Sequence, residues 1–338
     1  MRVKRIGLLA CSNGMGHVRR MLALALALRE FGARPVVIAE GRKLARLAQA
    51  YGVDPPELIE FSGPTARSDW VTAFGSDWIR DLPDLDDYDE VVSDNLVEVL
   101  ERRSDAWMSG SFFWHRALSG FPTCRFEHAE SLLHRHRPRM VTSSLFTSPY
   151  LAASARLIEV GLYAIPRGVP SGGGTDALVA CGTGGGADAE ASALLQEIAA
   201  GPRPCFGTVW VEPCIYKAGL PAWMQAATFT PAMYAGLRCA VIRPGVGTAT
   251  DALLAGARVF SFYEAGNDEM RVNAMRISAA GVGEDVGNAC HAWQAAFRFM
   301  GDINLQREHR IAVQALDRDG AQEAATVILY GQQAKQSE

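Results

Sequence analysis

Residues 12–20 contain the side chains of this chain that are best suited to chemistry. Gly14 and Gly16 stand directly before His17, between one apolar run and another. Glycines let a backbone turn sharply and let a ligand approach closely. The first turn of a helix also offers free N–H groups and a partial positive charge, which suit an anion. A histidine side chain exchanges a proton near neutral pH, so His17 adds a titratable group to a turn that is suited to ligand binding.

Two other interpretations of this turn stay open at the level of sequence. Gly14-x-Gly16 also begins a dinucleotide-binding fingerprint, and Glu40 stands where an acidic residue would meet a ribose. However, Arg19 occupies the place of the fingerprint's third glycine, where close helix–strand packing needs a small residue. A plain tight turn without a ligand is the other interpretation.

A second glycine turn lies in residues 241–257, where Gly245, Gly247 and Thr248 follow an apolar strand and precede an apolar helix. Residues 266–274 follow it with an acidic and amide-containing segment. Together these segments resemble the donor-site signature of GT-B glycosyltransferases, G-G-x-G-T-x-x-E-A-L-x-x-G followed by D/E-Q-x-x-N-A. With the first turn included, the chain is similar to the enzymes that add N-acetylglucosamine to peptidoglycan lipid intermediates. It also resembles their macrolide- and lipid-glycosylating relatives.

The resemblance implies a nucleoside-diphosphate sugar, such as a UDP-sugar, as the donor. Backbone N–H groups at the glycine turns would stabilise the leaving diphosphate, so no metal and no cofactor are expected. Asp251 would bind ribose hydroxyls, whereas Glu269 and Asn273 would bracket the sugar. The expected donor-binding residues are Gly14, Gly16, Gly182, Thr183, Phe229, Thr230, Gly245, Gly247, Thr248, Asp251, Glu269 and Asn273.

His17 is then the expected general base, which takes the proton of an acceptor hydroxyl in an inverting transfer. Asp94 ends the predicted strand 88–94 and is expected to orient the imidazole, a pairing that some relatives have. Two alternatives stay open. The alternative for Asp94 is that it caps the following helix. The alternative for His17 is that it packs in the turn or binds the acceptor without accepting a proton.

Departures from the family pattern raise two further functions. Asp251 stands where the family has glutamate, Met270 where it has glutamine, and Pro244 where the donor loop has its first glycine. One alternative is a nucleotide-sugar hydrolase of the nonulosonate-pathway type, which uses water as the acceptor. The other is a catalytically inactive sugar-nucleotide-binding protein.

Strand-like and helix-like blocks alternate along the chain, which is typical of a parallel, doubly wound sheet. The predicted strands cover residues 6–11, 34–39, 88–94, 106–113, 177–181, 239–242 and 259–262. Residues 165–174 are rich in glycine, proline and serine and are predicted to form a linker. We predict an α/β GT-B fold, in which two Rossmann-like domains face a central cleft. The predicted domains are an acceptor-binding domain 1–168, a donor-binding domain 174–320, and a C-terminal helix and tail 321–338.

The composition and net charge of the chain limit the kinds of partner that are expected. A chain of 338 residues with a net charge of -4 has no basic footprint, so nucleic acid is not expected. The seven cysteines are scattered without a Cys-x-x-Cys pair, which argues against a zinc ribbon and favours a reducing cytoplasm. Arginines interleave with the histidines of residues 125–139, so a basic face is favoured there over a metal site.

The expected acceptor is a small molecule, a glycan or a lipid-linked compound. The aromatic run 112–114 leaves weak peripheral membrane contact open.

Overall fold

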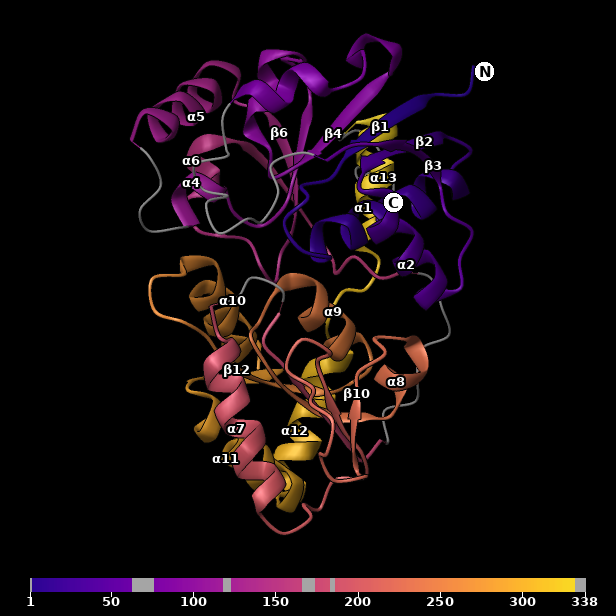
Figure 1. The fold of residues 1–338 in the computed structure, drawn as a ribbon. Coiled ribbons are helices and arrows are strands. Elements are labelled where there is room, and N and C mark those ends of the chain that lie inside the picture. The colour runs from indigo at the N-terminus through magenta and orange to yellow at the C-terminus, as the bar shows by residue number, and fades with distance from the viewer. Residues whose placement is uncertain (1, 63–75, 118–122, 166–173, 183–185, 332–338) are drawn as a thin grey trace. The chain divides into compact units, whose positions relative to one another are not determined.

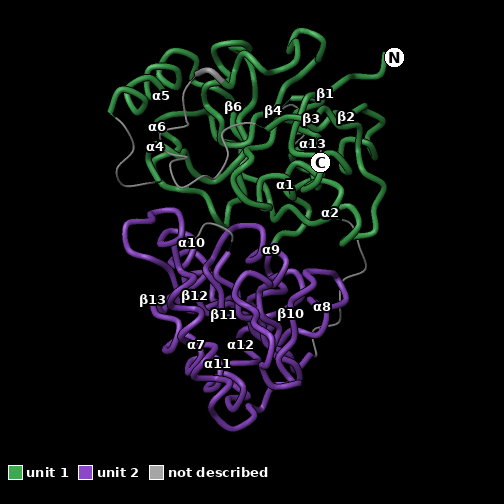
Figure 2. The backbone as a smooth tube through the Cα atoms, in the orientation of Figure 1, with its two compact units in different colours: residues 1–166, 317–338 green, residues 167–316 purple. Residues whose placement is uncertain are grey.

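The computed structural model describes residues 2–62, 76–117, 123–165, 174–182 and 186–331. The chain divides into two compact units, one of residues 1–166 with 317–338 and one of residues 167–316 (Figure 2). Each unit is an α/β structure built on one parallel sheet, so the predicted fold class is confirmed. Most of the predicted linker, residues 166–173, lies outside the described residues.

The first unit contains a seven-stranded sheet in the order β3-β2-β1-β4-β5-β6-β7, with parallel neighbours throughout (Figure 1). Its strands are β1 (Arg5–Leu9), β2 (Arg34–Ala39), β3 (Glu57–Glu60), β4 (Glu90–Asp94), β5 (Trp107–Ser109), β6 (Arg139–Ser143) and β7 (Arg156–Val160). The strand order reverses between β1 and β4. Ligands of open α/β sheets bind beyond the carboxyl ends of the strands at such a reversal.

Apolar side chains from both faces of this sheet are buried. Within β1, Leu8 packs into one hydrophobic cluster and Leu9 into the other, as expected for a strand covered on both sides. The helices of the unit are α1 (Gly16–Glu30), α2 (Gly41–Tyr51), α4 (Trp114–Ala117), α5 (Thr123–His136), α6 (Leu151–Ser154) and α13 (Gly320–Tyr330). Ile328 of α13 shares a cluster with Leu22 of α1, so the last helix completes the core of the first unit.

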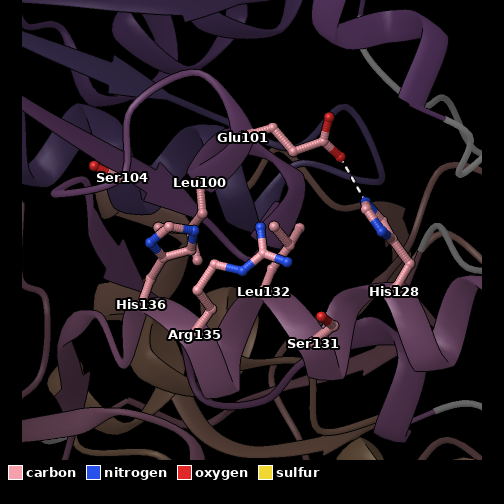
Figure 3. A pocket seen from close by; sticks show the side chains of 8 residues that line it. All are labelled: Leu100, Glu101, Ser104, His128, Ser131, Leu132, Arg135 and His136. Atoms are coloured by element: carbon pink, nitrogen blue, oxygen red, sulfur yellow. Dashed lines mark hydrogen bonds and ion pairs between the residues drawn. The ribbon is translucent and has the colours of Figure 1, made fainter.

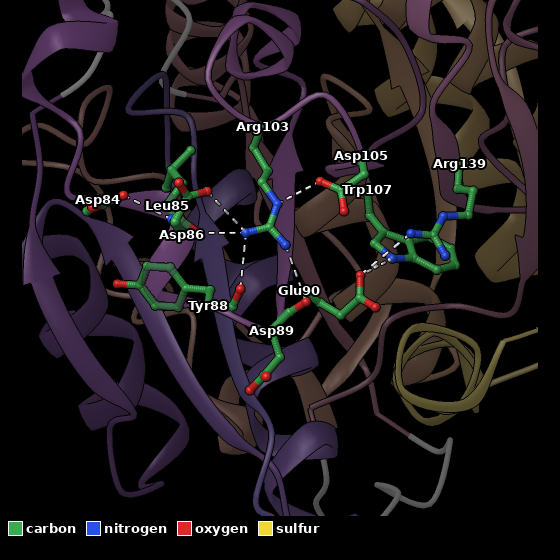
Figure 4. Close-up of polar contacts among 10 residues, drawn as sticks. All are labelled: Asp84, Leu85, Asp86, Tyr88, Asp89, Glu90, Arg103, Asp105, Trp107 and Arg139. Atoms are coloured by element: carbon green, nitrogen blue, oxygen red, sulfur yellow. Dashed lines mark hydrogen bonds and ion pairs between the residues drawn. The ribbon is translucent and has the colours of Figure 1, made fainter.

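Polar contacts fix the neighbouring strands β4, β5 and β6 at the edge opposite the carboxyl ends (Figure 4). Glu90 accepts a hydrogen bond from the Trp107 indole at 3.0 Å and pairs with Arg139 at 3.6 Å. The Arg139 guanidinium lies 4.0 Å from the centre of the Trp107 ring. Arg103 donates to the carbonyl oxygens of Leu85 and Tyr88, which anchors the segment that leads into β4. These contacts help to position the strand that ends at Asp94.

The second unit contains a six-stranded parallel sheet in the order β10-β9-β8-β11-β12-β13. Its strands are β8 (Asp176–Ala180), β9 (Val209–Val211), β10 (Met224–Ala226), β11 (Leu237–Ile242), β12 (Arg258–Phe262) and β13 (Gly283–Gly287). Its helices are α7 (Asp188–Ala200), α8 (Pro231–Ala235), α9 (Val246–Leu254), α10 (Asp268–Ala279), α11 (Ala289–Gly301) and α12 (Ile303–Gln314). This sheet reverses between β8 and β11, the two strands that precede the predicted glycine turns.

One predicted strand, residues 106–113, is largely wrong. Only Trp107–Ser109 pair as β5, and the chain then turns at Gly110, which has a φ of +139°. Phe112 and Phe113 are buried in the loop between β5 and α4. The aromatic run that suggested membrane contact therefore belongs to the core of the first unit.

Candidate active site

His17 lies in the first turn of α1, directly beyond the carboxyl end of β1. The chain reaches this helix through Gly14, whose φ of +81° favours a residue without a side chain. The imidazole is almost completely buried, at 7% exposure, and its Nδ1 atom lies 2.8 Å from Oδ1 of Asp94. The structure thus brings together the two residues that were predicted to be catalytic.

Asp94 is the last residue of β4 and is fully buried. Its Oδ2 atom lies 3.5 Å from Nε of Arg20, one turn after His17 on α1. The carboxylate is therefore flanked by the imidazole and by a guanidinium. It does not cap a helix, because the 3-10 helix Val97–Glu101 begins after Leu96 and has no side-chain cap. Burying a carboxylate without such partners would cost several kcal/mol.

The contacts of His17 leave one ring nitrogen for chemistry. An ionised carboxylate only accepts hydrogen bonds, so the bond to Asp94 assigns a proton to Nδ1 and leaves Nε2 as the basic atom. The Trp114 ring packs 5.4 Å from the imidazole and restricts its orientation. Within the described residues, Nε2 has no hydrogen-bond partner. The arrangement suits general-base chemistry, in which a third group holds the imidazole in one tautomer.

Arg19 explains the broken dinucleotide fingerprint. Its side chain is buried and donates to the Tyr51 hydroxyl at 3.2 Å and to the Tyr163 carbonyl at 2.9 Å. Glu40, the acidic residue of that interpretation, pairs with Lys43 at 3.0 Å. Arg19 thus joins α1 to two other segments of the first unit, a structural task that a glycine would not perform.

The second glycine turn lies at the start of α9, which follows β11. Gly245 is the N-cap of this helix, and the helix begins at Val246. Gly247 and Thr248 are therefore inside its first turn, where N–H groups lack partners within the helix. No acidic residue occupies that turn, so its partial positive charge remains available for an anion.

The turn before α9 is held by the amide of Asn273, which donates to the Pro244 carbonyl at 2.9 Å. Asn273 is 1% exposed, so its observed contact is internal to the protein. Next to it, Arg243 forms two hydrogen bonds to Glu264, at 2.8 and 2.6 Å. Burial raises the pKa of Glu264, but the hydrogen bonds and charge of Arg243, together with hydrogen bonds from the backbone and Asn267, hold it below its usual range. Sequence reasoning did not predict this ion pair.

The other predicted donor residues occupy several elements of the second unit. Asp251 is a buried residue of α9, and Glu269 is half-buried in the first turn of α10. Thr230 caps α8, because its hydroxyl accepts a hydrogen bond from the Met233 N–H. Phe229 has a φ of +51°, an unusual conformation for a bulky residue. Gly182 follows β8 at the reversal of the sheet, whereas Thr183 lies outside the described residues.

The histidine-rich helix α5 lines a separate hollow of about 400 Å³ in the first unit (Figure 3). His128 bonds to Glu101 at 2.6 Å, and Arg135 and His136 extend along the same wall. The contact joins α5 to the 3-10 helix Val97–Glu101, and the basic face stays a prediction.

Glu98, in the 3-10 helix beside this hollow, gives a testable effect of pH. Burial raises the pKa of its carboxyl group from 4.5 to about 7. Between these values the unfolded chain ionises this group while the folded protein keeps it protonated, so folding loses about 3 kcal/mol as pH rises from 4.5 to 7. We expect E98Q to abolish this loss and to be more stable than the parent protein at pH 8. Urea unfolding at pH 4.5 and 8 measures the difference. The exposed E127Q serves as control, and an equal pH dependence in E98Q would contradict the prediction.

Solved structures share this fold at low sequence identity. The glycotransferase of kitacinnamycin superposes with a TM-score of 0.66 and 15% identity, over 98% of this chain and 100% of the other. Arabidopsis thaliana UGT89C1, in complex with quercetin, gives 0.63 and 12%, over 97% and 98%. Streptomyces sp. SF2575 glycosyltransferase SsfS6, in complex with thymidine diphosphate, gives 0.58 and 16%, over 96% and 99%. The fold is that of the GT-B glycosyltransferases.

No family model matches the sequence, and a search of curated proteins found no match. Among the described residues, no helix combines the length and the apolar character needed to cross a membrane.

Proposed function

We propose that this protein transfers a sugar from a nucleoside-diphosphate sugar to an acceptor hydroxyl group, with inversion at the anomeric carbon. The observation that carries the proposal is the buried His17–Asp94 pair, with 2.8 Å between Nδ1 and Oδ1. It lies at the reversal of the first sheet, where ligands of such folds bind. The fold of known glycosyltransferases supports the reaction class.

In the proposed reaction, Nε2 of His17 accepts the proton of the acceptor hydroxyl as its oxygen attacks the anomeric carbon. The bond between that carbon and the diphosphate oxygen breaks at the same time, and the nucleoside diphosphate leaves with the electron pair. Asp94 stabilises the imidazolium that forms and keeps the ring in its productive orientation. Arg20 holds the carboxylate from its other side.

We assign most of the donor contacts to the second unit. N–H groups at Gly247 and Thr248 would stabilise the diphosphate, so this step needs no metal. Asp251 and Glu269 would contact ribose and sugar hydroxyls, and Phe229 with Thr230 would hold the base. Asn273 would act through the Pro244 turn that it supports. The proposed donor contacts also include Gly14, Gly16, Gly182, Thr183 and Gly245.

The nucleotide and the acceptor are open parts of the proposal. One structure of the same fold holds thymidine diphosphate and another holds quercetin, which supports a nucleotide donor and a small-molecule acceptor. A glycan or a lipid-linked acceptor fits the same chemistry. The seven cysteines are all free thiols, which supports a location in the reducing cytoplasm.

Two linked measurements test the function. Thermal unfolding with UDP, TDP, GDP, CDP or ADP should reveal one nucleotide that raises the melting temperature most, because a ligand of the native state stabilises it by mass action. The corresponding nucleotide sugars are then incubated with and without a panel of acceptors. Product formation that requires an acceptor supports transfer. Complete release of free sugar without acceptor identifies a hydrolase instead, and tight nucleotide binding without any turnover identifies a binding protein.

A further inference from the structure

Three side chains with metal-ligating atoms gather in the second unit, beyond the carboxyl ends of β8 and β9. They are Cys181, Glu212 and Cys214, and one ligand atom from each lies within 4.8 Å of the others. Cys181 follows β8 directly, and Glu212 follows β9. Because β8 and β9 are parallel neighbours, the sheet itself brings these distant residues together. The mechanism proposed above uses none of them.

The spacing of the two sulfur atoms suits a tetrahedral ion. Sγ of Cys181 lies 3.8 Å from Sγ of Cys214, and no disulfide joins them. In a tetrahedral zinc site each thiolate lies about 2.3 Å from the ion, which places two sulfurs about 3.8 Å apart. The observed pair therefore needs little rearrangement to hold such an ion.

Glu212 is already oriented by the backbone. Its Oε2 atom accepts hydrogen bonds from the N–H groups of Cys181 and Gly182, at 2.8 and 2.7 Å. Both bonds end on the same oxygen, so Oε1 keeps its lone pairs for a ligand. Hydrogen bonds of this kind fix ligating carboxylates in metal sites. The side chain is also buried, at 7% exposure.

Asp188, the first residue of α7, supplies a second carboxylate, which interacts with the side chain of Cys181. Its Oδ1 atom is buried and has no hydrogen-bond partner within the described residues. An unpartnered buried carboxylate oxygen of this kind is available to a cation.

We propose that Cys181, Glu212 and Cys214 bind a zinc ion, with Asp188 or water as the fourth ligand. Two thiolates favour a soft or borderline metal over magnesium or calcium. The ion ties Glu212 and Cys214, which follow β9, to Cys181 at the end of β8, so its role is structural. The ion takes no part in the sugar-transfer step, and the site goes beyond the function proposed above.

The test measures zinc binding by the full-length, reduced protein against a chromophoric chelator. We expect one equivalent of Zn²⁺ to bind, with protons released from the thiols. C214S should weaken the affinity for zinc by about 100-fold or more, because even the loss of a residue that only hydrogen-bonds to a metal ligand lowers metal affinity by about 10–100-fold. The exposed Cys205 of the same unit provides the matched control, and C205S should bind zinc like the parent protein. Substitution with Co²⁺ should give the absorption of a tetrahedral thiolate complex, which C214S should lack.

A second variant separates a lost ligand from a lost fold. C214H supplies a different zinc ligand at the same exposed position, so it should restore most of the affinity that C214S loses. The proposal is overturned if the reduced protein takes up no zinc, or if C205S weakens binding as much as C214S. It is also overturned if C214H binds no better than C214S while circular dichroism shows both to be folded. If the reduced protein binds no zinc and a disulfide between Cys181 and Cys214 forms in air, the two residues are a redox pair instead.

Discussion

Replacement of His17 by alanine should lower the rate of sugar transfer by about 10²–10⁴-fold, the range that general-base catalysis supplies. The loss should appear in kcat, because the proton is transferred during the chemical step. Binding of the nucleotide should change little, since the His17 side chain is not among the proposed donor contacts, most of which belong to the second unit. Steady-state kinetics and nucleotide titration by calorimetry measure the two effects separately.

The exposed His134 of α5 provides the control for this substitution, and H134A should retain full activity. H17A must also keep the melting temperature of the parent protein to within a few degrees, so that loss of fold does not imitate loss of the base. If H17A transfers sugar at the parent rate while it binds the donor normally, His17 is not the base.

Substitution of Asp94 by asparagine should have an effect of similar size, about 10²–10⁴-fold on kcat. Asparagine keeps the shape of the side chain but loses its charge. It also presents an amide N–H as readily as an oxygen, so it no longer holds the proton on Nδ1 of His17. Arg20 would lose its ion-pair partner at the same time. Kinetics measured beside H17A and the double variant show whether the two residues act together.

The double variant gives the sharper result. If Asp94 works only through His17, D94N should cost almost nothing further once His17 is alanine, because residues that act as one unit are strongly non-additive. Additive losses would show that Asp94 matters for another reason, such as the stability of β4. D105N, at an exposed carboxylate before β5, controls for the change of charge and should leave kcat unchanged.

The pairing of His17 with Asp94 was predicted because His17 stands in a glycine turn after the first strand and Asp94 ends a predicted strand, and because the resemblance implies such a pair. The strand at residues 34–39 was also predicted with its observed bounds. By contrast, β9 and β10 have three residues each and carry too short a pattern to be recognised. Residues 112–113 were predicted to belong to a strand because they are apolar, and apolar character alone does not distinguish a strand from a buried loop.

Partners far apart in the sequence were the hardest part of the site to predict. Arg20 lies three positions after His17, so helical spacing places it near the same face, yet only the fold brings it to Asp94. The pairing of Arg243 with Glu264 depends on the adjacency of β11 and β12, and that of Cys181 with Cys214 on β8 and β9. Patterns within a single sequence do not predict which side chains on neighbouring strands will be in contact.

The return of α13 to the first unit bears on how the protein is made. The second unit is continuous in sequence, so it is complete when the ribosome has released residue 316. At that point the first unit still lacks the helix whose apolar face, with Ile328, packs beside Leu22. The unit that begins first along the chain is therefore the last to be completed. A premature stop near the C-terminus would thus damage the half that carries His17, and the amino-terminal half cannot be expressed intact as one continuous fragment.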